Sequence, residues 1–347
     1  MEKQSNLGFA DLAISHRRIK STFFEQMNLL LDWQHIEIII KKHYNKGVSV
    51  AGRPSYPGIL LFKMTLLQTW YGLSDYEVED QVKDRISFSR FVGVSMEEDV
   101  PDHSVISRFR SELTRVGAYD KLLQEVNRQL EKHHILLRSG AIVDASITDS
   151  PRKPRGKKEY QAVEDRNEET GEVTTKAVEQ IQSHVDTDAA WIKKRNKLRY
   201  GFKQHTATDE NGLDLNVVTT AANESDISHL EDVLDNSKLI KGASVKADKG
   251  YKSQKNDEIL KEKGYRNRIL RKASKNRSLT PREIQFNKLV SRTRYRVERT
   301  FGSMRRWFGA GTARYVGLAK MHTQHLMEAI AYNLYRAPRI IASLCEQ

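Results

Sequence analysis

Three acidic residues have the types and surroundings that metal-assisted phosphoryl transfer requires. Asp144 follows the apolar pair Ile142-Val143, Asp248 ends the run from Val245 to Ala247, and Glu298 lies inside an expected long helix. Carboxylates at one edge of a sheet hold Mg²⁺, and two such ions would activate an attacking oxygen and stabilise a leaving one. The chain has 45 acids, so the simpler reading stays open, in which the aspartates cap helices and the glutamate forms an ion pair.

Basic residues are concentrated just around the third of these acids. The whole chain has 58 Lys and Arg against 45 Asp and Glu, a net charge of +13, and the segment 266–306 alone holds fourteen basic residues and two acids, or +12. A solvated helix face normally pairs its charges with opposite ones one turn away, and here almost no acids are available. The segment therefore predicts a surface that binds a polyanion, with nucleic acid as the first candidate.

Length and composition indicate the number of domains and argue against an internal disulfide, a membrane partner and a zinc site. A chain of 347 residues with 38% hydrophobic residues predicts two domains with an ordinary core, and the single Cys345 cannot form an internal disulfide. No apolar run reaches about 18 residues and the N-terminus lacks the features of a signal peptide, so we expect no membrane partner and a cytoplasmic location. The histidines have no cysteine partners at zinc spacing, so no zinc site is expected.

Residues 1 to about 135 are expected to be helical. Pro57 opens one helix, Ser74 and Glu77 have capping-box spacing at the start of the next, and Asp102 caps a third. The third helix places its apolar residues inward, and we expect Arg108 and Arg110 to lie outside. Short capped helices with exposed arginines are compatible with a helix-turn-helix-like DNA reader, although any small helical bundle gives this pattern.

The pattern changes near residue 136, where we place a domain boundary. The expected order is a strand at 141–147, a hairpin of 200–208 and 213–221, a helix from 225, a strand at 244–248, a helix at 253–263, a strand at 265–270, and helices at 281–308 and 322–341. This order predicts an α/β domain built on one mixed sheet. The charged stretch 150–176 has almost no large apolar residues and is expected to be a flexible surface insertion.

The long helix at 281–308 has a clear buried stripe. Val297, Phe301, Met304 and Phe308 recur at steps of four, three and four, which places Glu298 about 100° round from the stripe. We therefore expect Glu298 to face inward at the rim of the core.

Five ordered passages resemble a known family. The first runs from Pro101-Asp102-His103-Ser104 to Arg110, and the second is Val143-Asp144-Ala145-Ser146. The third combines Asp186-Thr187-Asp188 with the segment from Tyr200 to His205. The last two are Ala247-Asp248-Lys249-Gly250-Tyr251 and the segment from Arg294 to Gly302. From about Pro57 to Leu334 the chain resembles the DDE transposases of bacterial insertion sequences, specifically the insertion sequence 5 group of the insertion sequence 4/5 superfamily.

The resemblance implies an RNase H-like catalytic domain at 136–347, preceded by an all-helical domain at 1–135 for DNA binding and dimerisation. It implies that Asp144, Asp248 and Glu298 are the catalytic acids and bind two Mg²⁺ ions, for which Mn²⁺ can substitute. The family's last motif has a tyrosine and a lysine at positions that hold Ser291 and Arg305 here. Arg305 keeps the charge, whereas Ser291 has no phenol, although a tyrosine stands one turn away.

Arginines on the long helix suit phosphate. Arg294, Glu298 and Arg305 lie at i, i+4 and i+11 and share one face, so we expect Glu298 to hold metal while the arginines grip phosphates on either side. The alternative is that Arg294 pairs with Glu298. Asp186 and Asp188 are expected either to support the metal site or to be structural. The full set of expected DNA contacts is Arg108, Arg110, Lys203, His205, Lys249, Arg294, Arg299, Arg305 and Arg306.

The resemblance implies an insertion-sequence transposase that works on the nucleoid. It would bind double-stranded DNA at terminal inverted repeats, hydrolyse the element ends to free 3′-hydroxyls, and join them to target DNA. Because two ends must be joined, we expect a homodimer or a larger assembly on DNA. Two other classes stay open: a DNA-binding regulator that has lost its chemistry, and an RNase H-like nuclease.

Overall fold

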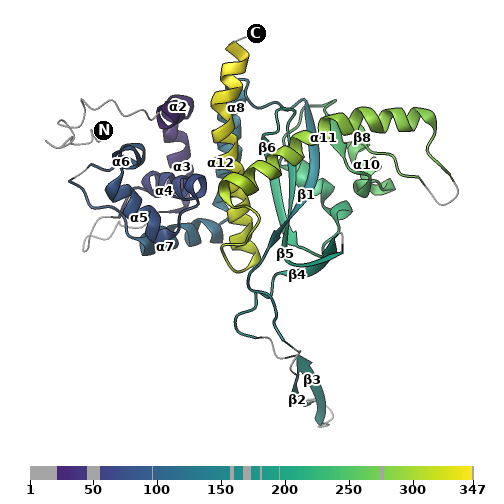
Figure 1. The fold of residues 1–347 in the computed structure, drawn as a ribbon, viewed down its shortest axis with the longest axis horizontal. Coiled ribbons are helices and arrows are strands. Elements are labelled where there is room, and N and C mark those ends of the chain that lie inside the picture. The colour runs from purple at the N-terminus through teal and green to yellow at the C-terminus, as the bar shows by residue number, and fades with distance from the viewer. Residues whose placement is uncertain are drawn as a thin grey trace.

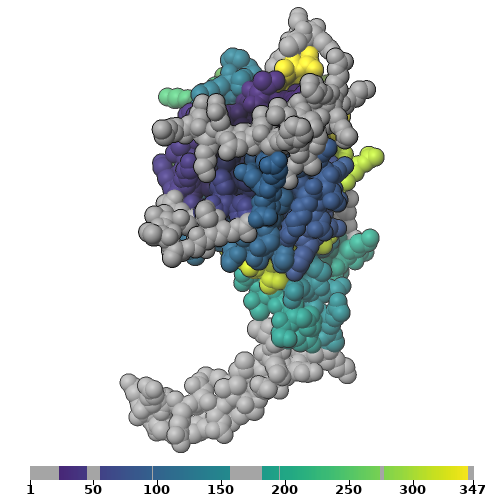
Figure 2. Space-filling view, turned by 90° about the vertical axis from the view of Figure 1, so that its left-hand side faces the viewer, coloured from purple at the N-terminus to yellow at the C-terminus, as the bar shows by residue number. Residues whose placement is uncertain are grey.

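Seven α-helices make up the described part of the N-terminal region in this computed structural model. The structure describes residues 22–44, 55–95, 97–156, 160–166, 173–179, 182–194, 196–273 and 277–345. The helices are α2 (Thr22–Leu30), α3 (Trp33–His43), α4 (Gly58–Tyr71), α5 (Asp75–Asp84), α6 (Ile86–Val92), α7 (His103–Arg115) and α8 (Ala118–Lys132). They gather on one side of the molecule, which Figure 2 shows in purple and blue. The expectation that this region is helical is confirmed for its described residues.

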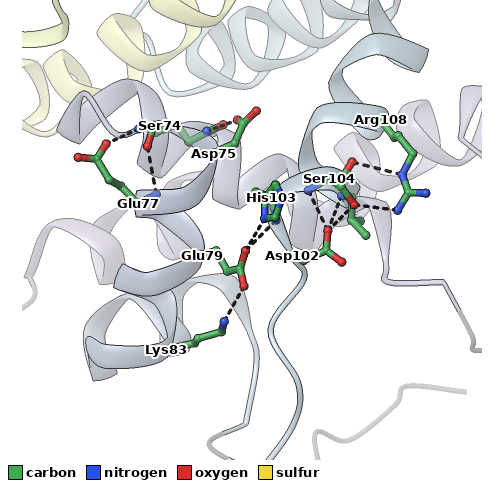
Figure 3. Close-up of polar contacts among 11 residues, drawn as sticks. Ser74, Asp75, Glu77, Glu79, Lys83, Asp102, His103, Ser104 and Arg108 are labelled. Carbon is green, nitrogen blue, oxygen red and sulfur yellow. Dashed lines mark hydrogen bonds and ion pairs between the residues drawn. The ribbon is translucent and has the colours of Figure 1, made fainter.

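Local sequence explains where these helices begin. The Ser74 hydroxyl accepts the backbone N–H of Glu77, and the Glu77 carboxylate accepts the N–H of Ser74, so the predicted capping box starts α5. The Asp102 carboxylate accepts two backbone N–H groups at the start of α7. Glu79 of α5 then accepts the backbone N–H of His103, which fixes α7 against α5 (Figure 3).

A mixed sheet forms the second half of the protein. Its strands are β1 (Gly140–Asp149), β4 (Ala190–Lys194), β5 (Lys197–Thr208), β6 (Asp214–Ala221), β7 (Ser244–Ala247) and β8 (Arg266–Ile269). The main order is β6-β5-β1-β7-β8, in which β6, β5 and β1 are antiparallel neighbours while β7 and β8 run parallel to β1. The predicted α/β class, with a mixed sheet that follows a helical region, is confirmed.

The predicted hairpin is formed by β5 and β6. Its turn uses Gly212 at a φ of 81°, a conformation that favours glycine. The buried Asp209 carboxylate accepts backbone N–H groups of Leu137, Asn211 and Leu213, so it fixes both the turn and the chain that enters β1. Burial raises the pKa of Asp209 to about 6.

The sheet is flanked by the remaining helices. These are η1 (Asp226–His229), α9 (Leu230–Asp235), η2 (Lys249–Tyr251), α10 (Gln254–Glu262), α11 (Pro281–Phe308) and α12 (Leu318–Cys345). The bounds of α11 are those predicted, because Thr280 and Glu283 form a capping box and Gly309 ends the helix at a φ of 69°. The last helix begins at Leu318, four residues before its predicted start. No helix in the described ranges is long and apolar enough to cross a bilayer.

Helix α12 joins the helical region to the sheet. It lies between them in Figure 1, and it packs on β6 as well as on α8, α4 and α7. The Asn333 side chain of α12 donates to Asn127 of α8 and to the backbone oxygen of Asp214 in β6, so one buried network connects three elements. One apolar core accordingly runs from Phe24 to Ile340 across the predicted boundary near residue 136.

The charged insertion contains two strands that the sequence did not predict. β2 (Tyr160–Arg166) pairs with β3 (Val173–Glu179), and this hairpin extends away from the main sheet in Figure 1. At its base, the Gln182 side chain exchanges hydrogen bonds with the backbone of Arg155. Residues 157–159 and 167–172 of the predicted insertion lie outside the described part of the chain.

Candidate active site

Two of the three predicted acids are neighbours across a pair of parallel strands. Val143 of β1 is paired in register with Ala247 of β7, so the next residues along the two strands, Asp144 and Asp248, stand side by side. Adjacent strands lie about 4.8 Å apart, which is close enough for both carboxylates to contact one cation. The Asp248 carboxylate also accepts the backbone N–H of Lys249, so it caps η2. The register brings these two aspartates together at the sheet, while their role as metal ligands stays a prediction.

The guanidinium of Arg294 lies between the two carboxylates. Its Nη2 is 3.2 Å from Oδ2 of Asp144, and its Nη1 is 3.4 Å from Oδ1 of Asp248. The arginine is on α11, which crosses the sheet beside β1 and β7. Within the described residues Arg294 forms no ion pair with Glu298, so the pairing that the helix spacing allowed is not the one adopted.

Burial and nearby charges act on the carboxyl of Asp144. Burial raises the pKa of Asp144, the Arg294 guanidinium partly offsets this, and the neighbouring Asp248 adds to the rise. Tyr251 of η2 is buried close by, and burial together with nearby carboxylates raises the pKa of its phenol. An unpaired carboxylate at position 144 would therefore be under electrostatic strain, and a cation between the two acids relieves it.

Glu298 does not face inward, contrary to the expectation from the helical stripe. The stripe itself is confirmed, since Val297, Phe301, Met304 and Phe308 are buried, but Glu298 is exposed. The stripe faces the core, and Glu298, about 100° round the helix from it, lies on a side of α11 that the core does not cover. Among the residues that the structure describes, no three of His, Cys, Asp and Glu are close enough to hold one metal ion.

Glu298 lines an open groove beside β1, which we call the β1–α11 groove. Its lining residues are Ala145, Ser146, Ile147, Asp149, Lys194, Lys197, Leu198, Arg199, Glu298, Phe301, Gly302 and Arg305. Four of these carry positive charge and two carry negative charge. A Cβ atom at Gly302 would meet nothing within 4 Å, so this face of α11 has open space beside Gly302.

Two arginines are held along the groove. Nη2 of Arg305 donates to Oγ of Ser146 at 2.6 Å, and Arg199 makes a two-pronged ion pair with Asp149 at 2.7 and 2.6 Å. Burial and the nearby Arg199 lower the pKa of Arg305, which shows that the cations repel one another. A groove with fixed, mutually repelling cations is favourable for an anionic ligand.

Three of the groove cations were not predicted from the sequence. Lys194 and Lys197 flank the tight turn between β4 and β5, where Asn196 has a φ of 61°, and Arg199 follows on β5. The only sequence signal is a short alternation from Ala190 to Lys194, which is too brief to separate from a loop.

Three predicted DNA contacts are buried or paired, contrary to the expectation that they reach the surface. Arg110 makes a two-pronged ion pair with Asp75 at 2.9 and 2.8 Å, and its guanidinium also lies over the ring of Tyr315. Lys203 and His205 point into the layer between β5 and η1 and are buried. The strand has helices on both faces, so neither of its faces is a solvent face.

The buried pair on β5 has internal partners. Nζ of Lys203 forms an ion pair with Asp226 at 2.8 Å, and Nε2 of His205 lies 3.0 Å from Oγ1 of Thr220. Burial lowers the pKa of His205 to about 4, so the ring is neutral near pH 7. Neither residue is placed to contact DNA directly.

The other predicted contacts are at the surface. Arg108 is exposed and donates only to Ser104 on its own helix (Figure 3). The remaining exposed residues are Lys249, Arg299, Arg305 and Arg306, and Ser291 is exposed as well. Asp186 and Asp188 are not at the paired aspartates, because their carboxylates accept backbone N–H groups at the start of α12, from Gly317 and Leu318.

Comparison with known proteins defines the class to which this fold and site belong. The Transposase DDE domain family matches residues 136–334, and a second family described as a transposase domain matches residues 13–112. The transposase for insertion sequence element IS1106 of Neisseria meningitidis serogroup B is 38% identical over 232 residues, which cover 66% of this chain and 76% of that protein. The chain belongs to the Transposase DDE domain family and is an insertion-sequence transposase.

Solved structures show lower similarity. The piggyBac transposase synaptic complex with hairpin DNA covers 96% of this chain and 78% of that chain, with 11% sequence identity and a TM-score of 0.46. The Mos1 strand transfer complex covers 92% and 95%, with 12% identity and a TM-score of 0.21. Membership of the DDE family implies dependence on a divalent metal ion.

Proposed function

We propose that Asp144, Asp248 and Glu298 are the catalytic carboxylates of this transposase, and that it binds the terminal inverted repeats of its own element. It hydrolyses one strand at each end to free a 3′-hydroxyl, and that hydroxyl then attacks target DNA. Both steps are in-line displacements at phosphorus, so one site serves both with different nucleophiles. We place this activity in the bacterial cytoplasm, on nucleoid DNA, in a dimer or a larger assembly.

The observation that carries the proposal is the convergence of Asp144 and Asp248 on one cation. Both carboxylates contact the same guanidinium, so the pair accepts a positive charge placed between them. Mg²⁺ requires only one or two carboxylates with water and phosphate as further ligands, and this pair fits one such ion. Glu298 lies in the adjoining β1–α11 groove, and we propose that it joins the metal site when DNA is bound.

A bound divalent ion would polarise the scissile phosphate and lower the pKa of an attacking water or hydroxyl. The chain's own residues have different tasks. Asp144 and Asp248 would hold the divalent ion at the sheet, and the groove cations Lys194, Lys197 and Arg305 hold the phosphates on either side of the reacting one. Lys249, Arg299 and Arg306 extend the positive surface along α11 and η2, and Arg108 adds a contact from the helical region.

The experiment that tests the function compares substrates. A labelled duplex carrying the repeats that flank this reading frame is incubated with the protein and Mg²⁺, beside a duplex with scrambled repeats and an RNA–DNA hybrid. We expect nicking at the repeat end only, no nicking in EDTA, and Mn²⁺ in place of Mg²⁺ to support it. Tight repeat binding without any nicking would instead indicate a regulator, and cleavage of the hybrid would indicate a ribonuclease.

A further inference from the structure

We propose that Arg294 is an internal counter-ion, which occupies the cation position between Asp144 and Asp248 in the free protein and leaves it when DNA phosphate is bound. The inference depends on the proposed function, because it takes the two aspartates as metal ligands. It adds that metal binding and DNA binding are coupled through one side chain. The free protein would consequently bind a divalent ion weakly.

The geometry of the pair supports this role. Arg294 contacts both carboxylates at once, at 3.2 and 3.4 Å, and its side chain is 15% exposed against 22% for Asp144 and 41% for Asp248. No other Lys, Arg or His in the described part of the chain forms an ion pair with either aspartate. The guanidinium therefore offsets part of the negative charge of the pair, and one negative charge remains for a divalent ion to balance.

The same geometry makes Arg294 a competitor of the metal. Two carboxylates held side by side repel each other, and each is stabilised by a cation between them. A divalent ion that binds both must remove the guanidinium, so it loses affinity by the free energy of the two ion pairs. Part of the site is solvent-exposed, which moderates that loss.

A displaced guanidinium needs a new acceptor. Nε of Arg294 is buried and has no hydrogen-bond partner in the structure, so the side chain already has an unused donor. Its planar guanidinium matches the geometry of phosphate oxygens. Arg294 lies on α11, the helix that also carries Glu298 and Arg305. A DNA phosphate at the site therefore accepts Arg294 and frees the aspartates for the metal. By linkage, DNA must raise the affinity for the ion by the same factor as the ion raises the affinity for DNA.

A purely structural role for Arg294 predicts the opposite result. If the arginine only fastened α11 to β1 and β7, its removal would loosen the site and weaken metal binding. If it is a competing counter-ion, its removal tightens metal binding. The sign of the change thus separates the two roles without any measurement of catalysis.

The test measures Mn²⁺ binding to the full-length, DNA-free protein, by electron paramagnetic resonance of the unbound ion. Arg294→Gln is compared with wild type, with Arg292→Gln and with Asp144→Asn. Arg292 is a matched control, because it lies on the exposed side of the same helix and its loss removes the same charge. Thermal unfolding in EDTA checks that each variant is folded.

We expect Arg294→Gln to bind Mn²⁺ about tenfold more tightly than wild type, a change of about 1.4 kcal/mol. Arg292→Gln should stay within about twofold, and Asp144→Asn should weaken binding at least tenfold. Should Arg294→Gln fail to fold, Arg294→Lys carries the test with an expected tightening of about threefold, since one ammonium cannot span both carboxylates as the guanidinium does.

The outcomes separate this inference from the proposed function. Weaker binding in Asp144→Asn together with unchanged or weaker binding in Arg294→Gln would overturn the counter-ion role and leave the metal site in place. Unchanged binding in Asp144→Asn would overturn both, because the ion would then be bound elsewhere.

Discussion

Arg110 provides a quantitative test of the helical region, because sequence and structure assign it different roles. The sequence placed it on the outside as a DNA contact, whereas the structure pairs it with Asp75 between α7 and α5. We predict that Arg110→Gln lowers the free energy of unfolding and leaves the DNA affinity of the folded protein nearly unchanged.

The size of the effect follows from the contacts. Removing one partner of a fully buried ion pair costs about 3–5 kcal/mol. The side chains of Arg110 and Asp75 are 12% and 23% exposed, and Asp75 keeps a hydrogen bond from Gln68 at 2.6 Å, so the loss should be smaller, about 2–3 kcal/mol. With an unfolding entropy of about 2.1 cal/mol/K per residue over 347 residues, this lowers Tm by about 3–4 °C.

The assay is urea unfolding followed by circular dichroism, combined with repeat binding at a temperature where every variant is folded. Arg108→Gln is the matched control on the same helix, since Arg108 is exposed and, among the described residues, its hydrogen bonds go to Ser104. We expect it to change the free energy of unfolding by less than about 0.5 kcal/mol and to weaken DNA binding. A double-mutant cycle with Asp75→Asn should give a coupling energy of about 2 kcal/mol. Unchanged stability with lost DNA binding in Arg110→Gln would refute the structural assignment.

Three further predictions concern the sheet, the buried acid on α12 and the basic surface. Gly201→Ala should destabilise the fold by more than about 3 kcal/mol or prevent soluble expression, because a Cβ there would lie 2.0 Å from the backbone oxygen of Thr148. In the same urea assay, Gly302→Ala should stabilise α11 by about 0.5–1 kcal/mol. Burial raises the pKa of Glu328 to about 7, so ionisation of this carboxyl opposes folding above that pH, and the penalty fades as the pH falls toward 4.5. Glu328→Gln should therefore raise the urea midpoint at pH 8 and have little effect on it at pH 5. An equal effect at both pH values would contradict the assignment. Arg306→Gln should reduce the slope of log K against log salt for DNA binding by about one, and an unchanged slope would mean that this exposed arginine does not contact phosphate.

Local sequence signals were sufficient for most of the elements. The capping boxes at Ser74 and Thr280 and the Asn-Gly turn of the hairpin each satisfy backbone groups within a few residues, so the sequence alone indicates where α5, α11 and the hairpin begin or end. β2 and β3 were not predicted, because two polar, charged strands have no apolar face to mark them. β4 was not predicted because its five residues are too few to show a clear alternation of polar and apolar side chains.

The candidate site was predictable where it depends on strand register and not where it depends on packing between distant segments. Asp144 follows a short apolar run inside β1 and Asp248 follows β7, and the parallel pairing of those strands brings them together. The position of Arg294 between them requires knowledge of where α11 crosses the sheet, which its helical period does not contain. In the same way, the helical periodicity of α7 does not indicate that Arg110 pairs with Asp75 of α5. The alternation of residues on β5 does not indicate that Lys203 and His205 are covered by other elements.

The central claim is that Asp144, Asp248 and Glu298 together carry out metal-dependent cleavage at the element ends. The most direct measurement is nicking of the labelled repeat duplex in Mg²⁺ by wild type and by Asp144→Ala, Asp248→Ala and Glu298→Ala, each shown to be folded and to bind the repeat. The structure and the family predict nicking at the repeat end by wild type and none above background in all three variants. Cleavage that survives any one of the substitutions would contradict the assignment of that acid.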